Sequence, residues 1–158
     1  MKFKLKIGKK IPSFLFYKLK KEKKNIQNIE DKIIFINFWS IECDYCIKEI
    51  VKIEEIITKN KDIYFLFINC GNSKEDVYSF LNKKNLKLNV LLDEDDYLTE
   101  LLDIKNIPTS IIINKSKNIL NIFIGEQNKN KYNSTIKNIL NDFNINQNKE
   151  KKNKIYNI

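Results

Sequence analysis

One stretch of the chain constrains its fold more than any other. The apolar run IIFINFW at residues 33–39 is followed at once by SIECDYC. The run is rich in β-branched and aromatic residues, which predicts a buried strand. After the second cysteine, apolar residues recur at helical spacing over residues 47–57, which predicts an amphipathic helix. A buried strand therefore leads directly into a Cys-x-x-Cys pair, Cys43 and Cys46, at the start of a helix.

Strand-like and helix-like segments continue to alternate along the chain. β-Branched and aromatic runs predict the strands, while N-capping residues and apolar stripes predict the helices. The predicted strands are residues 14–19, 33–39, 63–69, 89–92, 110–114 and 119–125, with an exposed turn at residues 20–25. The predicted helices lie within residues 46–58, 74–81, 93–103 and 132–143. This order predicts an α/β fold, in which helices flank a central mixed sheet, with an N-terminal edge strand or hairpin.

The length of 158 residues suits one domain with a core of its own. Hydrophobic residues make up 42% of the chain, which is typical of a packed globule. We predict a single domain over residues 1–145. The polar, Lys- and Asn-rich tail at residues 146–158 is expected to be frayed.

The net charge of +9 is concentrated at the two ends of the chain. Residues 1–25 carry a net +9 and residues 147–158 a net +3, so the segment between them, which holds the cysteines, is at −3. The chain has no arginine and no aromatic-basic motif of an RNA-binding module, so we expect no nucleic-acid partner. Attraction of the basic ends to an anionic membrane surface stays open, with no other feature to support it.

The sequence contains no recognisable membrane or export signal. No apolar run approaches the ~20 residues of a membrane-spanning helix. The segment MKFKLKIGKKIPSFLFYK lacks the apolar stretch of about 7–15 residues that a signal peptide needs. As written, the chain is expected in the cytoplasm. It is expected outside the cytoplasm if a signal or anchor has been removed.

The cysteine pair is best explained by thiol-disulfide exchange. Cys43 is expected at a helix start, where unpaired N–H groups and the helix dipole stabilise a thiolate. Cys46, one turn deeper, can attack a mixed disulfide and release the partner. A structural zinc site usually needs four Cys or His ligands, whereas the chain offers only Cys70 in addition and no histidine, so we expect no metal. Inert core cysteines would not need this spacing at a strand–helix junction.

Three features resemble the TlpA/ResA-like branch of the thioredoxin superfamily. They are Phe-Trp before the cysteine pair, Glu49 three residues after Cys46, and Ile-Pro-Thr at residues 107–109 opening a strand. The similarity runs from about residue 11 to residue 125 and includes a helix inserted between the second and third core strands. Members of this branch are bacterial thiol-disulfide oxidoreductases. Many are membrane-anchored reductants of apocytochrome c or of other exported proteins.

The resemblance implies a thioredoxin-like fold and a substrate-docking loop. Pro108 is expected to be cis and to face the cysteine pair. The substrate-binding candidates are Trp39, Ile107, Pro108 and Thr109. The resemblance also implies protein thiols and disulfides as substrates, an upstream thiol donor, and no cofactor besides the redox-active Cys43–Cys46 disulfide. We expect a monomer.

Glu49 is the candidate acceptor for the proton of Cys46. It is expected one turn beyond Cys46 on the same helix face, where partial burial would raise its pKa. The chain has no histidine, so a carboxylate has to take this role. The alternative is an ordinary surface carboxylate. Asn37 stands where ordinary thioredoxins keep a buried aspartate, and we expect a polar neighbour of the pair there rather than a catalyst.

Two positions depart from the family pattern. Glu42 stands where Trp usually precedes the first cysteine, and Tyr45 stands where Pro usually precedes the second. Glu42 and Asp44 place two negative charges beside Cys43, and like charges disfavour a thiolate. We therefore expect a reductant with a potential of about −270 mV or below, and a Cys43 pKa of about 7 or higher.

Two further features are expected to be structural. Cys70 ends a predicted strand and is expected to be a small buried hydrophobe, with a regulatory disulfide as the alternative. The acidic cluster at residues 93–96 lacks the glycine and the distal glutamate of a calcium loop, so we expect it to cap a helix.

One alternative function stays open at this point. A redox-inert thioredoxin-like module could use the cis-proline groove and the basic ends to hold a partner. The joint presence of Cys43, Cys46, Glu49 and Pro108 favours catalysis, because a binding module has no need of them.

Overall fold

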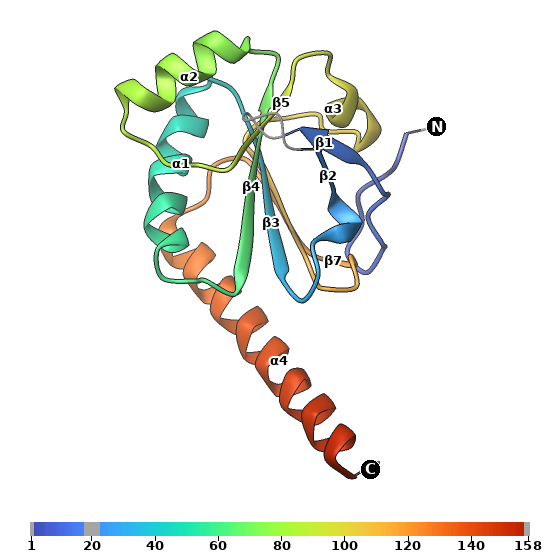
Figure 1. The fold of residues 1–158 in the computed structure, drawn as a ribbon. Helices are drawn as coiled ribbons and strands as arrows, with labels where there is room; N and C mark the ends of the chain where they lie inside the picture. Colours follow the sequence, from blue (N-terminus) through green and yellow to red (C-terminus); the bar gives the residue numbers. More distant parts are fainter. Residues whose placement is uncertain (1, 18–22, 157–158) are drawn as a thin grey trace. The chain divides into compact units, whose positions relative to one another are not determined.

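The structure is a computed structural model of the chain and describes residues 2–17 and 23–156. The chain forms two compact units, residues 1–126 and residues 127–158. The first unit contains two β-sheets and the cysteine pair, and the second is built from a helix (Figure 1).

Five strands of the first unit form a mixed sheet in the order β5-β4-β3-β6-β7 (Figure 1). Strand β3 pairs in parallel with β4, which pairs in parallel with β5, while β6 is antiparallel to both β3 and β7. The strands are β3 Ile33–Trp39, β4 Ile63–Cys70, β5 Val90–Asp93, β6 Thr109–Ile113 and β7 Ile119–Ile124. This is the predicted mixed α/β sheet, with the strand that precedes the cysteines at its centre.

The helices of the first unit begin where side chains satisfy their unpaired N–H groups. Ser73 caps α2 by accepting a hydrogen bond from the N–H of Asp76 over 3.2 Å. Asp93 accepts from the N–H groups of Leu98 and Thr99 at the start of α3, each over 2.9 Å. The acidic cluster therefore caps a helix as predicted, through its first member. The helices are α1 Asp44–Ile57, α2 Lys74–Lys83 and α3 Tyr97–Leu101.

Alternate residues of β3 face opposite sides of the sheet. Its even-numbered apolar residues belong to a core that also takes in α3 and the N-terminal segment. Its odd-numbered residues face α1 and α2, since Asn37 donates a hydrogen bond to Glu49 of α1 and the Trp39 ring lies 5.7 Å from the Phe80 ring of α2. The helix that starts at the cysteine pair therefore covers the second face of the sheet.

The N-terminal region forms a sheet of its own. Strands β1 (Leu15–Tyr17) and β2 (Lys23–Asn25) pair in antiparallel register and do not join the five-stranded sheet. Of the two expected forms, the edge strand and the hairpin, the structure has a hairpin-like pair. Strand β2 replaces part of the exposed turn predicted at residues 20–25, because its backbone pairs with β1. Residues 18–22 lie outside the described residues.

Strands β6 and β7 form the predicted hairpin. At its turn, Lys117 has a positive φ of 68°, and Asn114 donates its N–H to the Asn118 carbonyl over 3.0 Å. At the opposite end, the N–H of Gly125 donates to the carbonyl of Pro108 over 2.8 Å. This bond attaches the end of β7 to the loop that precedes β6.

The second unit contains the helix α4, Lys129–Tyr156. The prediction of a helix at residues 132–143 followed by a frayed tail is wrong in extent, because the helix continues through the polar segment. No glycine or proline occurs after residue 127, so no strong helix breaker interrupts the segment. The predicted domain boundary at residue 145 stays a prediction. Within the described part of the chain, no helix combines the length and the apolar character that crossing a membrane requires.

Candidate active site

Cys43 lies at the junction of β3 and α1, where it is the N-cap residue of the helix. Its Sγ accepts a hydrogen bond from the N–H of Cys46 over 3.2 Å. The same sulfur lies 3.9 Å from the carbonyl oxygen of Ile107. The peptide bond between Ile107 and Pro108 is cis. The structure therefore places the first cysteine at a helix start and opposite the proline loop, as expected.

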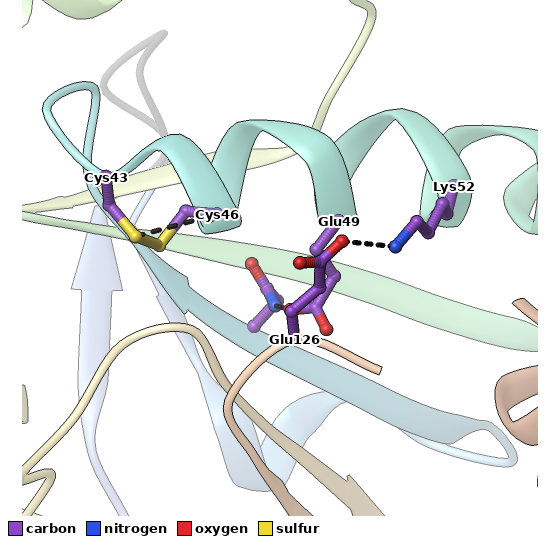
Figure 2. A network of polar contacts seen from close by, with 6 residues as sticks. Cys43, Cys46, Glu49, Lys52 and Glu126 are labelled. Carbon is purple, nitrogen blue, oxygen red and sulfur yellow. Dashed lines mark hydrogen bonds and ion pairs between the residues drawn. A yellow bond between two sulfur atoms is a disulfide. The ribbon is translucent and has the colours of Figure 1, made fainter. Parts of the chain in front are cut away.

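Cys43 and Cys46 form a disulfide, with their Cα atoms 5.2 Å apart (Figure 2). The two cysteines differ in access, since Cys43 is partly exposed and Cys46 is fully buried. In the reduced protein, the N–H of Cys46 and the dipole of α1 favour a thiolate at Cys43. Cys43 is therefore the more accessible of the two cysteines.

An exposed carboxylate, Glu42, is held in a fixed position directly before Cys43. Ser40 donates its hydroxyl to Glu42 over 2.6 Å, and the Asn72 amide donates to both carboxylate oxygens over 3.0 and 2.9 Å. These hydrogen bonds, with that of Ser40 the strongest, lower the pKa of Glu42 below its ordinary value. Glu42, the residue before Cys43, is therefore ionised at neutral pH.

Asn72 connects the cysteine loop to the end of β4. Its Oδ1 accepts from the N–H of Ile41 and from the Asn69 amide, each over 3.0 Å. The contact of Asn72 with Glu42 was not predicted from the sequence. A signal was present: Asn69 and Asn72 flank the end of the strand next to β3, and the carboxyl ends of parallel strands meet at one edge of a sheet.

Glu49 is fully buried and lies one turn beyond Cys46 on α1. The Asn37 amide donates to Glu49 over 3.2 Å and to the Ser110 hydroxyl over 2.9 Å. Asn37 and Ser110 are paired neighbours on β3 and β6. Ser110 was missed from sequence, although it is a polar residue directly before the three isoleucines of β6. The burial of Glu49 excludes the alternative that it is an ordinary surface carboxylate.

A charged pair lies next to Glu49 in the same polar network. Lys52 occupies the next turn of α1, and its ammonium group forms an ion pair with Glu126. Figure 2 shows Glu126 rising from the segment after β7 toward α1, at the level of Glu49. Lys52 and Glu126 were not predicted to meet, because nothing local in the sequence connects a helix residue with one placed beyond β7.

Three of the four substrate-binding candidates lie together where the loop opposite the cysteine pair enters β6. Ile107 is partly exposed, whereas Pro108 and Thr109 are buried. Trp39, the fourth, is entirely buried and packs against Phe80 of α2. In this structure it contacts the core rather than a substrate surface. Its role in substrate binding stays a prediction.

Cys70, the third cysteine, ends β4 and carries a free thiol. It packs against the core that includes α3, and the Thr99 hydroxyl lies 3.6 Å from its sulfur. Burial raises the pKa of the Cys70 thiol to about 11. Cys70 is therefore a protonated thiol at neutral pH, and it is partly buried against the core rather than fully buried as expected.

The fold and the site together define a thioredoxin-like thiol-disulfide oxidoreductase with a redox-active Cys-x-x-Cys pair. The chain belongs to the Redoxin family, whose sequence model matches residues 6–140.

Relatives of known sequence or structure agree with this assignment. The chain is 29% identical to the thiol-disulfide oxidoreductase ResA of Bacillus thuringiensis (strain Al Hakam) over 138 residues, which cover 86% of this chain and 80% of that protein. Its fold is similar to that of StoA from Bacillus subtilis, with a TM-score of 0.69, 20% identity, and coverage of 79% of this chain and 96% of that one. It is also similar to that of the exposed lipoprotein thioredoxin of Streptococcus pneumoniae strain TIGR4, with a TM-score of 0.67, 21% identity, and coverage of 80% and 99%. The ResA similarity confirms the predicted resemblance.

Proposed function

We propose that this oxidoreductase is a reductant of protein disulfides, with Cys43 as the attacking thiolate and Cys46 as the resolving thiol. The difference in access between the two sulfurs carries the proposal. Cys43 is partly exposed, accepts an N–H hydrogen bond at the helix start and faces the Ile107 carbonyl, whereas Cys46 is fully buried. An exposed, stabilised thiolate is the form that attacks a disulfide.

The reaction is a two-step exchange. The Cys43 thiolate attacks one sulfur of the substrate disulfide, and the other substrate sulfur leaves as a thiolate that takes a proton from water. Cys46 then gives its proton to Glu49 and attacks the Cys43 sulfur, which breaks the mixed disulfide. The second substrate sulfur leaves as a thiolate and takes a proton from water. Two electrons pass to the substrate, and the protein is left with the Cys43–Cys46 disulfide. An upstream thiol donor restores the dithiol, and no cofactor takes part.

The environment of Glu49 supports its role as proton acceptor. Glu49 lies one turn beyond Cys46, and residues three apart on a helix are neighbours on one face. Burial disfavours the charged form of a carboxyl group, so a buried carboxylate readily takes up a proton. The Asn37 amide holds the carboxylate in place by a hydrogen bond of 3.2 Å.

The direction of electron flow follows from the charges around the exposed sulfur. Glu42 is ionised, and Asp44 is an exposed acid on the other side of Cys43. Both charges oppose a Cys43 thiolate, so they make the reduced protein less stable relative to the disulfide. A less stable reduced form is a stronger reductant.

Reduction of insulin by dithiothreitol tests the exchange activity. The wild type should accelerate the reaction, and Cys43→Ser should abolish the acceleration. Cys70→Ser is the matched control and should behave as the wild type. Cys46→Ser should accumulate a mixed disulfide between Cys43 and the substrate, visible by mass spectrometry. Absence of acceleration by the wild type, under conditions in which a thioredoxin works, would refute the proposed function.

The compartment and the physiological substrate are a separate part of the proposal. The similar protein of Streptococcus pneumoniae is named an exposed lipoprotein, which supports placement outside the cytoplasm rather than the cytoplasmic expectation. Disulfides of exported proteins are then the substrate class, with apocytochrome c as the candidate that the family resemblance supplies. Labelling of whole cells with a membrane-impermeant thiol reagent, after reduction, tests the placement. Labelling of Cys43 only after lysis would contradict it.

A further inference from the structure

Glu49 is a buried acid whose neighbours decide how tightly it holds a proton. Asn37 of β3 and Ser110 of β6 form the polar but uncharged side of its surroundings. The charged residues that Figure 2 draws beside Glu49 are Lys52 on α1 and Glu126 beyond β7, and the cysteine pair does not titrate while it is oxidised. Charges within about 4–6 Å strongly shift the ionisation of a buried acid. The Lys52–Glu126 pair is therefore placed to act on Glu49.

Lys52 is brought to Glu49 by the geometry of α1. Residues three apart on a helix have Cβ atoms about 5–6 Å apart on the same face. Lys52 is only 30% exposed, so solvent screens its charge incompletely. A cation in this position stabilises an ionised Glu49.

Glu126 is brought to the same place by the backbone. The preceding residue, Gly125, has a positive φ of 80°, a conformation that side chains other than glycine rarely adopt. The Gly125 N–H is bonded to the Pro108 carbonyl over 2.8 Å. The chain is thereby turned so that the Glu126 side chain, 25% exposed, reaches the ammonium group of Lys52 (Figure 2). Glu126 offsets the cation and adds a negative charge on the side of Glu49.

We infer that Lys52 and Glu126 are positioning residues that set the pH at which Glu49 gains and loses its proton. Lys52 favours the ionised form of Glu49, and Glu126 opposes that effect. The near balance of the two charges leaves Glu49 able to accept a proton from Cys46 and then to release it. This inference rests on the proposed function of Glu49.

Carboxyl titration of the oxidised protein by carbon-13 NMR tests the inference without any assay of activity. The Glu49 signal is identified by its loss in Glu49→Gln. In Glu126→Gln the cation is unopposed, so the Glu49 midpoint should fall by about one pH unit. In Lys52→Met the negative charge is unopposed, so the midpoint should rise by about one pH unit. The double variant should return close to the wild type.

Two substitutions at exposed positions serve as matched controls, Glu94→Gln and Lys59→Met, and both should leave the midpoint unchanged. Opposite shifts in the single variants support the inference, because a purely structural role would not produce opposite signs. Equal, parallel or absent shifts would overturn it. Lys52→Gln replaces Lys52→Met if the latter loses its native circular dichroism spectrum.

The same set of variants separates failure of this inference from failure of the proposed function. If Glu49→Gln exchanges disulfides at the wild-type rate while the midpoints shift as expected, the charge pair tunes Glu49 but Glu49 is not the proton acceptor. If Glu49→Gln is slow and the midpoints do not move, Glu49 is the acceptor and the pair does not tune it.

Discussion

Each cysteine of the active pair has its own glutamate, and the two glutamates lie in opposite environments. Glu42, beside the partly exposed Cys43, is exposed and held by Ser40 and Asn72, and its pKa is lowered. Glu49, beside the buried Cys46, is itself fully buried. One residue type thus supplies a fixed charge next to one cysteine and the proposed proton acceptor next to the other. Environment, rather than residue type, assigns the two roles.

The largest effect should come from a change of the buried glutamate, Glu49. Glu49→Gln removes the proton acceptor for Cys46, so resolution of the mixed disulfide should slow by about ten-fold or more near neutral pH. Stopped-flow measurement of mixed-disulfide decay checks this, with Glu54→Gln on the same helix as the control. Decay at the wild-type rate at every pH would assign Glu49 a purely structural role.

A smaller effect is expected from a change of the exposed glutamate, Glu42. Glu42→Gln removes a negative charge next to Cys43, so the thiol pKa should fall by a few tenths of a unit. The potential should rise by about 10 mV, which corresponds to about a two-fold change in the exchange equilibrium. Equilibration with glutathione and titration with iodoacetamide measure both quantities, and Glu94→Gln is the control.

The wild-type values in the same experiment test the reductant assignment. The potential should be about −270 mV or below, and the Cys43 pKa should be about 7 or above. A potential of about −120 mV would contradict the assignment of the protein as a reductant. A Cys43 pKa below about 5 would contradict it too, because the flanking acids would then not control the thiol.

Asn72→Ala sharpens the comparison through a pH-dependent effect. Glu42 loses two hydrogen bonds, so its lowered pKa should move up toward the ordinary value of about 4.3. Glu42 is still ionised at neutral pH, so the potential there should match the wild type. Carbon-13 NMR titration should show the Glu42 midpoint at a higher pH in the variant than in the wild type. A change at neutral pH as large as that of Glu42→Gln would mean that the charge itself depends on Asn72.

The smallest effect is expected away from the pair. With a pKa of about 11, the Cys70 thiol is ionised at neutral pH in on the order of one molecule in ten thousand. Iodoacetamide should therefore label Cys43 of the reduced protein long before Cys70, as followed by peptide mass spectrometry. Labelling of the two at similar rates would show that Cys70 is open to solvent and reactive.

The parts of the site that lie close together in the chain could be predicted from the sequence. The strand, the cysteine pair and Glu49 belong to one continuous segment, whose apolar pattern and helical spacing place each side chain. Asn72, Ser110 and Glu126 reach the site from the ends of other strands. Their places depend on the sheet register and on the turn at Gly125, which no local pattern reveals.

The two errors in the fold have physical causes as well. The polar tail was expected to fray because it has no apolar stripe, yet it lacks any glycine or proline to interrupt the helix that precedes it. Strand β2 lies in a lysine-rich segment that has the composition of a turn, and it becomes a strand by backbone pairing with β1. Backbone hydrogen bonds do not depend on side-chain composition. The pattern of residue types therefore does not reveal such a strand.

The burial of Trp39 gives the protein a built-in optical reporter. It is the single tryptophan of the chain, it is fully enclosed, and it ends the strand that leads into the cysteine loop. Indole emission is quenched by a neighbouring disulfide and is sensitive to small changes in packing. Opening of the Cys43–Cys46 bond should therefore change the fluorescence of the unlabelled protein. The redox state of each variant can then be followed continuously in the cuvette, with no dye attached to the thiols under study.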